Sequence, residues 1–491
     1  MSLFFGINIA LKGMMAQQTA LNVTSHNIAN ANTEGYSRQR VNLETSVPIS
    51  GLASAGQLGS GVDIAEIVRI KDEFLNYQVR KETSRLENHI AVSHTLQQVE
   101  AVFNEPLDTG FNEQLSQFWN SWQELAKAPE SSPVRTVVKE AAGSLTDTLR
   151  QMSAQLHEIK DDINSQIQLA IKEVNSLSTR VARLNDQIVN VNITGQNAND
   201  FMDARDLALN ELAALGNISL TDCLDANGKP TGAIEVKLGN ITIVDAAGAH
   251  EISSSDINPD AVTDGELAGL LQAGGNSGQS NTVQFYIDKL NTLAVGIAKS
   301  INDIHTTGKD LDGNSGQDFF VFKDNEGELI DLTAVDWNDP WSSGLSAANI
   351  YLNANIENDV AKIAASKQGG IFLEGNGDIA LAIAELKHTL MKYDPASQML
   401  TNSNAGNLSL GAFYQDMIAE LGSAARETGK TVKNQQTLVD QNIKRRESIQ
   451  GVSLDEETVN MVLYQHAFDA SAKVISVMDE MMDTIINRLK A

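Results

Sequence analysis

The first stretch of the chain, from Met1 to Thr33, contains one side chain of Lys, Arg, Asp or Glu, although these residues make up 20% of the sequence. That residue is Lys12. Apolar residues recur in this stretch at alternating steps of four and three, the heptad pattern of an amphipathic helix: Ile7, Leu11, Met14, Leu21 and Ile28. The other face carries neutral hydrogen-bonding side chains. A helix with so little charge on any side is typical of one enclosed by other protein surfaces, so these residues are predicted interface residues.

A turn and two extended segments are predicted after this helix. Gly35 can adopt a positive φ and is predicted to end the helix. Residues 36–43 have the pattern of extended chain. Apolar residues then alternate from Val62 to Ile70, which predicts a strand.

The C-terminal segment carries a second heptad stripe. Its members step by three and four and are also predicted interface residues: Met461, Tyr464, Phe468, Ile475, Met478, Met482, Ile485 and Leu489. An adjoining stripe that includes Val474, Val477 and Met481 widens the apolar face. An apolar face of this width at the end of a chain requires a cover. We therefore predict that the N- and C-terminal helices pair as coiled-coil-like helices in an inner α-domain.

The fold class predicted from the whole sequence is mainly α with β-rich middle insertions. The longest heptad pattern extends from Leu156 to Val191, and it fits either packing within the chain or an intermolecular coil. Turn residues and short alternating segments predict a β-rich insert further along. The predicted segments are a terminal helix (1–40), an α-rich region (41–216), the insert (217–280), a mixed region (281–375), returning helices (376–450) and a C-terminal helix (451–491).

The net charge of −27 disfavours nucleic acid and anionic membrane surfaces as partners. One cysteine, Cys223, cannot form a disulfide within the chain. The sequence shows neither a cleaved secretory signal nor an apolar run long enough to span a membrane. Composition alone therefore predicts a cytosolic protein.

A calcium-loop spacing opens at Asp310, Asp312 and Asn314. The sixth position of that loop is Ser315 instead of glycine, and the twelfth is Val321 instead of glutamate. This pattern favours a glycine-rich turn over a metal site. We identify no phosphate loop, nucleophile elbow or metalloprotease motif, so we predict no catalytic, cofactor-binding or metal-ligating residues and no enzyme activity.

Two runs carry a family resemblance. The segment from Leu21 to Arg40, with Ser-His-Asn-Ile-Ala-Asn-Ala-Asn-Thr-Glu-Gly-Tyr-Ser at its centre, resembles the N-terminal signature of bacterial flagellar axial proteins. The segment from Gly451 to Ile475 resembles their C-terminal signature. The segments from Asp288 to Ala294 and from Gly308 to Gly316 are similar to the hook-associated members, specifically to the first subunit of the hook–filament junction.

This resemblance implies a structural subunit that joins the hook to the filament and templates filament assembly. The implied partners are the hook protein, the second junction protein, other copies in a ring or helical layer, and a cytoplasmic export chaperone at the C-terminal helix. Export is implied to occur through the flagellar channel without a cleaved signal, which replaces the cytosolic prediction, and the middle domains are implied to project outward. The alternatives are another axial subunit, or an exported adhesin or hydrolase with its activity in residues 217–375.

Overall fold

The computed structural model describes residues 3–50, 57–103, 110–275, 279–337, 339–367, 375–394, 398–402 and 406–485. The chain divides into two compact units. Unit 1 comprises Met1–Asn88, Gln168–Ala268 and Lys433–Ala491, and unit 2 comprises His89–Ile167 and Gly269–Val432. Four helices contribute residues to both units: α2 (Glu73–Phe103), α4 (Ser132–Ile193), α6 (Glu266–Gly274) and α10 (Leu410–Gln450).

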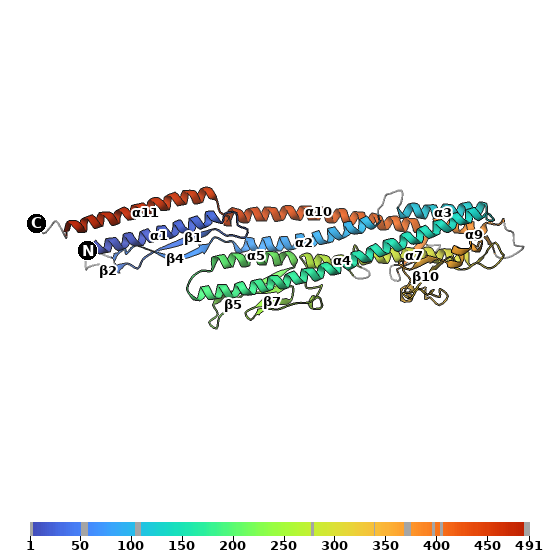
Figure 1. Cartoon of the computed structure of the whole chain (residues 1–491), viewed down its shortest axis with the longest axis horizontal. Coiled ribbons are helices and arrows are strands. Elements are labelled where there is room, and N and C mark those ends of the chain that lie inside the picture. Colours follow the sequence, from blue (N-terminus) through green and yellow to red (C-terminus); the bar gives the residue numbers. More distant parts are fainter. Residues whose placement is uncertain are drawn as a thin grey trace. The chain divides into compact units, whose positions relative to one another are not determined.

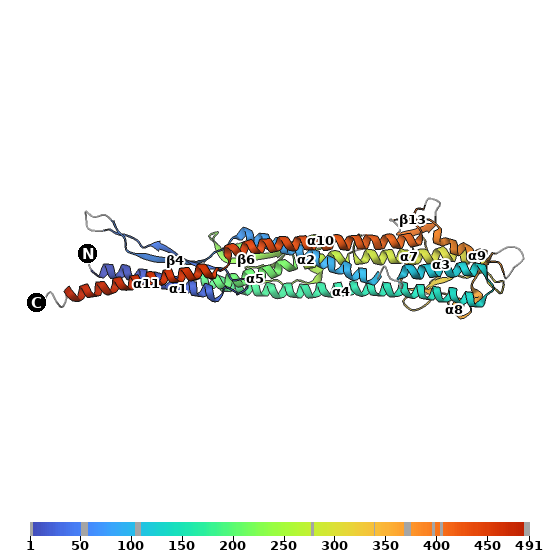
Figure 2. The same cartoon turned by 90° about the horizontal axis from the view of Figure 1, so that it is seen from above.

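Unit 1 contains both ends of the chain. Its own elements are α1 (Leu3–Ala29), β1 (Gln39–Thr45), β2 (Ile49–Ser50), β3 (Gln57–Leu58), β4 (Val62–Arg69), α5 (Asn199–Leu215), β5 (Ile218–Leu224), β6 (Pro230–Leu238), β7 (Ile241–Asp245), β8 (Gly248–Ala249), η1 (Ser254–Asp256) and α11 (Leu454–Asp483). Helices α1 and α11 lie side by side and antiparallel, with both chain ends at the same end of the pair (Figures 1 and 2). The predicted pairing of the terminal helices is confirmed.

The first helix is shorter than predicted. It ends at Ala29, and turns occupy the residues up to Gly35. These turns form because Asn30 Nδ2 donates to the His26 carbonyl (3.0 Å) and Thr33 Oγ1 donates to Asn30 Oδ1 (3.2 Å). Gly35 does have a positive φ of 79°, as predicted, but it lies in these turns and does not cap the helix.

Strands β1 and β4 form an antiparallel pair whose register extends from Gln39 opposite Arg69 to Thr45 opposite Val62. This confirms the strand predicted from Val62 onward. The pair packs against α1. Lys12 is tied to it, because its Nζ lies 2.9 Å from Asp63 Oδ1 and donates to Ser46 Oγ at 2.9 Å. The one ammonium group of the Met1–Thr33 stretch is therefore matched within the chain.

Helix α4 has 62 residues and begins at Ser132, well before the predicted start of its heptad pattern. Its seam residues Val174, Val181 and Ile188 are fully buried. A Cβ on Gly232 of β6 would lie 3.0 Å from Ile188 Cγ2, so the sheet packs directly on this part of α4. The structure therefore favours packing within the chain over an intermolecular coil.

The insert contains a four-stranded antiparallel sheet with the order β5-β6-β7-β8. Buried side chains attach it to its helices. Asn185 of α4 donates to the Ile234 carbonyl (2.8 Å), and Arg205 of α5 donates to both Asn185 Oδ1 (3.0 Å) and the Gly232 carbonyl (2.6 Å). The part of the insert after β8 is not β-rich, because it contains η1 and the whole of α6. Apolar residues such as Leu267 and Leu270 of α6 are buried, which favours a helix there.

Unit 2 is built from shorter elements. They are α3 (Phe111–Lys127), α7 (Val283–His305), β9 (Gly308–Lys309), β10 (Phe320–Phe322), η2 (Pro340–Ser343), β11 (Ile350–Leu352), α8 (Ala354–Asn358), η3 (Val360–Lys362), β12 (Ser366–Lys367), α9 (Asp378–Glu385), η4 (Leu386–His388), β13 (Met391–Asp394) and β14 (Met399–Asn402). Helices α3, α7 and α9 lie together in both views (Figures 1 and 2).

The aromatic core of unit 2 consists of Phe118, Trp122, Phe319 and Phe320, which are all fully buried. The ring centroids of Trp122 and Phe319 are 5.2 Å apart, and those of Phe319 and Phe320 are 5.0 Å apart in an edge-to-face arrangement. Such pairs stabilise a core beyond the area they bury. Helix α3 and strand β10 therefore contribute to one core.

His305, at the end of α7, is completely buried beside this core, with its ring centroid 5.3 Å from that of Phe319. Its Nδ1 donates to the Gln317 carbonyl (2.5 Å), and its Nε2 accepts from the Ala364 amide (2.8 Å). Burial lowers the pKa of His305 to about 4. The imidazole is therefore neutral at pH 7 and locked in one tautomer.

The returning helices predicted for residues 376–450 are interrupted by a β-hairpin formed by β13 and β14. An aromatic cluster explains its position. Lys289 Nζ of α7 lies 4.3 Å from the ring centroid of Tyr393 in β13 and 5.0 Å from that of Phe413 in α10. The strands are too short for their alternation to stand out against the helical pattern on either side.

Candidate assembly interface

A small-residue seam of α1 faces α11. The contacts that define it are Gly6 with Met478, Gly13 with Ser471, and Asn27 with Glu457. A Cβ on Gly6 would lie 2.8 Å from Met478 Cε. Three other positions in this heptad phase also have small, buried side chains, namely Ala10, Ala20 and Thr24, whereas Gln17 is larger and half-buried. Small side chains allow the two helix backbones to approach closely.

The stripe of large apolar residues predicted for α1 is offset from this seam by one residue. Its members are half-buried and flank the contact with α11: Ile7, Leu11, Met14, Leu21 and Ile28. The sequence pattern identified the large apolar side chains, whereas in the structure the small side chains beside them face α11. Contacts of these residues with other subunits stay a prediction.

Helix α11 has one face packed and one open. The predicted stripe is half-buried at Met461, Tyr464, Phe468, Ile475, Met478 and Met482, whereas Ile485 is exposed and Leu489 lies outside the described residues. The adjoining apolar positions form an open stripe, which consists of Leu463, Val474, Val477 and Met481, with Leu463 60% exposed. The open stripe has no cover within the described part of the chain and is therefore available to a partner.

Asn27 fixes the inner end of the terminal pair, by which we mean α1 with α11. Its Nδ2 donates to the Gln39 carbonyl (2.9 Å) and to Glu457 Oε2 (3.2 Å). Its Oδ1 accepts from the Gln39 amide (2.9 Å) and from the Tyr36 hydroxyl (2.7 Å). Every donor and acceptor of this buried amide is therefore used, which joins α1, β1 and α11 at one point.

Arg38 joins the same point to the start of α11. Its Nε lies 2.7 Å from Glu457 Oε1, and its Nη1 lies 2.7 Å from Glu456 Oε2. Its backbone amide donates to the Gln450 carbonyl at the end of α10 (2.9 Å). Because Glu457 is almost fully buried, losing Arg38 would leave the buried charge of Glu457 without a counter-charge.

A second group of charges connects the β1–β4 pair to α5. Arg69 Nη1 lies 2.6 Å from Asp203 Oδ1 and 2.9 Å from Asp206 Oδ2, and Lys71 Nζ also lies 2.9 Å from Asp206. The Ser37 amide donates to Asp203 (3.0 Å). We call this group, together with Asn27, Arg38 and Glu457, the anchor network.

The electrostatics of the anchor network follow from its burial. Burial opposes ionisation of Asp206, but Lys71 and Arg69 outweigh it and hold the pKa of Asp206 below its usual value. Burial raises the pKa of Asp203 above its usual value despite the attraction of Arg69. Burial, and then Asp200, raises the pKa of the Tyr36 phenol, so the hydroxyl stays protonated as a donor. The network thus serves to position elements.

Sequence reasoning missed the anchor network. Its partners are far apart in the chain, as Asn27 and Glu457 show, and side-chain hydrogen bonds leave no periodic pattern. One signal was present: the neutral hydrogen-bonding side chains of the first helix include Asn27 itself. These were placed on the face away from the apolar stripe, whereas Asn27 lies on the buried seam.

A cleft of about 870 Å³ lies beside the anchor network in unit 1. Its walls come from the turns after α1, from α2, from α5, from the end of α10 and from the α10–α11 connection. Its lining mixes apolar side chains with charged ones and includes Glu34, Val79, Leu207, Arg446, Glu447 and Ile449.

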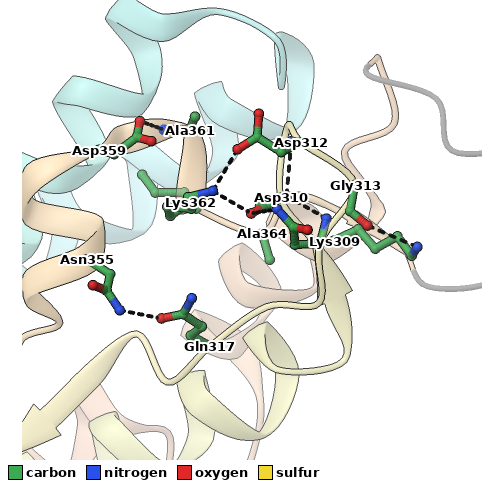
Figure 3. Close-up of polar contacts among 12 residues, drawn as sticks. Lys309, Asp310, Asp312, Gly313, Gln317, Asn355, Asp359, Ala361, Lys362 and Ala364 are labelled. Carbon is green, nitrogen blue, oxygen red and sulfur yellow. Dashed lines mark hydrogen bonds and ion pairs between the residues drawn. The ribbon is translucent and has the colours of Figure 1, made fainter.

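The Asp310 turn, which has a calcium-like spacing, forms ion pairs with a lysine side chain of the same chain instead. Asp310 Oδ1 accepts from the amides of Asp312 (3.0 Å) and Asn314 (2.8 Å), as an Asx turn does. Lys362 Nζ lies 2.7 Å from Asp312 Oδ2 and 3.6 Å from Asp310 Oδ2 (Figure 3). Val321 is buried in β10 and provides no oxygen ligand from its side chain.

No group of three or more His, Cys, Asp or Glu side chains in the described ranges could hold a metal ion. No helix among the described residues is both long and apolar enough to cross a membrane.

Family comparisons match three parts of the sequence. Residues 96–320 match the family described as "Flagellar hook-associated protein FlgK helical domain". Residues 448–489 match "Flagellar basal body rod FlgEFG protein C-terminal", and residues 7–36 match "Flagella basal body rod protein". The two terminal matches contain all of α11 and most of α1.

Curated relatives match along almost the whole chain. The flagellar hook-associated protein 1 of Bacillus subtilis (strain 168) is 29% identical over 99% of this chain and 98% of its own length. The proteins of the same name from Salmonella typhimurium and Escherichia coli (strain K12) are 25% and 22% identical, each over 98% of this chain and 99% of their own length.

A solved structure has the same fold. The flagellar hook junction protein FlgK from Burkholderia pseudomallei matches with a TM-score of 0.59 and 15% identity, over 77% of this chain and all of that one. The full-length relatives, the helical-domain family and the paired terminal helices agree. The chain is thus similar to flagellar hook-associated protein 1 along almost its whole length.

Proposed function

We propose that this chain is the structural subunit that joins the flagellar hook to the filament and templates filament assembly. The observation that carries the proposal is the match to flagellar hook-associated protein 1 along 98% or more of the chain in three bacteria. The terminal pair supports it, because both ends of the chain contribute one helical unit that is fixed at its inner end by the anchor network.

The proposed partners are the hook protein, the second junction protein and further copies of this chain in a ring or helical layer. The open stripe of α11 supports such contacts, since α11 already packs on α1 and still exposes Leu463, Val474, Val477 and Met481. In this assembly the terminal pair is the inner α-domain, and the middle regions project outward.

A further proposed partner is a cytoplasmic export chaperone that covers the C-terminal helix before export through the flagellar channel without a cleaved signal. Methionine adapts to different partners because its side chain is flexible and polarizable. Helix α11 contains three methionines near its end, Met478, Met481 and Met482, of which the first packs on Gly6 and the second is exposed. One helix can therefore present different apolar faces at successive stages.

We propose no catalytic activity for this chain. The buried charged groups described above are engaged in ties between elements: Arg69 with Asp203 and Asp206, and Arg38 with Glu457. Groups committed to ion pairs in this way have a structural role.

The test is an electron micrograph of cells from which this protein is deleted. The expected result is hooks without filaments, with flagellin shed into the medium. Expression of the full chain from a plasmid should restore filaments. Loss of the hook as well would indicate a different axial subunit, and normal filaments in the deletion strain would contradict the proposal.

A further inference from the structure

Helix α2 exposes a stripe of large side chains on one face. Phe74 is 70% exposed and Tyr77 is 55% exposed. Lys81 follows one turn later, is also exposed, and forms no ion pair among the described residues. Positions 74, 77 and 81 share one face of a helix. We call these three residues the α2 knob.

The other face of α2 lines the cleft described above, through Asn76, Val79 and Thr83. Helical periodicity places these residues roughly opposite the α2 knob. One copy of unit 1 therefore carries an aromatic projection on one side of α2 and a cavity on the other. Because these two surfaces lie on opposite faces of the same helix, they cannot contact each other within one copy.

The chemistry of the cleft complements the α2 knob. Apolar side chains that can receive aromatic rings line it, and these include Val79, Leu207 and Ile449. Its volume of about 870 Å³ is in the range of cavities that enclose groups of the size of a small molecule, roughly 300–1,000 Å³. Two exposed carboxylates in the lining, Glu34 and Glu447, form no ion pair among the described residues and match the charge of Lys81.

We propose that the α2 knob of one copy docks into the cleft of a second copy, with Phe74 and Tyr77 inserted and Lys81 facing Glu34 and Glu447. The inference rests on the self-association included in the proposed function. Because two different surfaces meet, the contact is heterologous, and its repetition gives a closed ring or a helical layer. Aromatic anchors surrounded by complementary charge are the usual source of affinity and specificity in such contacts.

A site-specific photocrosslink identifies the neighbour. Tyr77 of the full-length protein is replaced by benzoylphenylalanine in a deletion strain, and assembled flagella are irradiated, isolated and analysed by mass spectrometry. The expected crosslink joins two copies, with the second copy modified in residues 31–38, 206–211 or 443–456. The matched control places the same probe at Leu169, a 63% exposed residue of unit 1 on α4, and should give no crosslink in these segments.

Charge reversal tests the polar part of the contact. Lys81→Glu should reduce the fraction of cells with filaments by about threefold or more, because like charges then meet at every copy of the contact. Combining Lys81→Glu with Glu34→Lys or with Glu447→Lys should restore filaments. Circular dichroism and urea unfolding of the purified variants should match the unmodified protein, since all three side chains are exposed.

The outcomes separate this inference from the proposed function. If the unmodified protein restores filaments but Tyr77 crosslinks to the hook protein, to another protein or to a different part of the second copy, the docking is wrong and the function stands. The same holds if neither double variant improves on Lys81→Glu. If the unmodified protein itself fails to restore filaments, the proposed function fails first.

Discussion

The aromatic core of unit 2 and the terminal pair of unit 1 both consist of apolar side chains on helices, but they are buried to very different degrees. Phe118, Trp122, Phe319 and Phe320 are fully buried by their own chain. In the terminal pair, the large side chains of the predicted stripes are half-buried, and the open stripe is exposed. The residues with the lowest exposure in the pair are small or polar, such as Ala16 and Asn27.

This difference separates the apolar side chains that stabilise the monomer from those that remain available for assembly. The aromatic core is completed by a single copy, so its apolar area contributes to the stability of the monomer. The terminal pair buries a narrow seam and leaves its flanks half-buried or exposed, so the apolar area that stays exposed can contribute only when another surface covers it. Stability measurements on the monomer should therefore separate the two regions.

The largest effect on the monomer is expected in the aromatic core. Trp122→Ala should lower the free energy of unfolding by about 4 kcal/mol, because it removes a fully buried ring and leaves a cavity. The matched substitution Val477→Ala in the open stripe should change it by less than about 0.5 kcal/mol. Urea unfolding of both purified variants measures the difference. Similar losses of unfolding free energy in the two variants would show that the aromatic core and the open stripe do not differ in their contribution to monomer stability.

A somewhat smaller effect is expected from acidification of the same core. His305 is neutral when folded, with a pKa of about 4, whereas an exposed histidine titrates near 6.5. The unfolded chain therefore binds the proton first. The contribution of the neutral His305 to the free energy of unfolding is complete above about pH 6.5 and declines by about 3 kcal/mol as the pH falls to about 4.

Comparison of variants isolates this contribution from the titration of the many carboxylates. His305→Gln should unfold at a lower urea concentration at pH 7.5 but lose less stability than the unmodified protein between pH 7 and 4.5. His94→Gln, at an exposed position of α2, should follow the unmodified protein. An unchanged pH dependence in His305→Gln would show that this imidazole is not the titrating group.

The anchor network should show an intermediate effect that is confined to the terminal pair. Asn27→Ala removes the partner of the Gln39 amide and carbonyl, the Tyr36 hydroxyl and Glu457, which should cost about 2 kcal/mol. Hydrogen exchange should increase in residues 3–29 and 454–483, while residues of the aromatic core keep their protection. Asn22→Ala, at an exposed position of α1, is the control. Faster exchange throughout the chain would show that the anchor stabilises more than the pair.

The smallest effect on the monomer, and the sharpest contrast with assembly, is expected in the open stripe. Val477→Asp and Met481→Asp should each change monomer stability by less than about 0.5 kcal/mol, because both positions are exposed. Covered by a partner, the same carboxylates would be buried without a counter-charge. Chaperone affinity and the ability of added purified protein to restore filaments should therefore both fall, whereas Gln465→Asp should preserve both. If only chaperone binding falls, the stripe serves export alone.

Periodicity was sufficient to predict most of the helical framework. The heptads from Ile7, from Leu156 and from Met461 mark α1, α4 and α11, and the width of the last stripe led to the pairing of the chain ends. These elements are long, so several repeats agree on one pattern. Boundaries were less well predicted: α1 ends at Ala29 because local side-chain hydrogen bonds form turns before Gly35 is reached.

The site was predicted in outline but not in its contacts. The seam of α1 uses Gly6 and Gly13, whose lack of side chains makes them invisible to a search for apolar residues. The ties between Asn27 and Glu457, or between Arg69 and Asp203, depend on which elements the fold brings together, and no spacing in the sequence encodes that. The β13–β14 hairpin was missed because its strands are too short for their alternation to stand out against the helical pattern on either side.

The polar ties of the terminal pair are concentrated at one end of it. Asn27, Arg38 and Glu457 hold the inner end, and both chain termini lie at the opposite end, where Gly6 meets Met478. The pair is therefore fixed at its base, which is the inner end, and is less restrained near the chain termini. Thermal separation of α1 from α11 should begin near the chain termini and become rarer toward the base. An incoming subunit or chaperone could thus separate the last turns near the termini while the base stays fixed, so one partner can replace another without unfolding the protein.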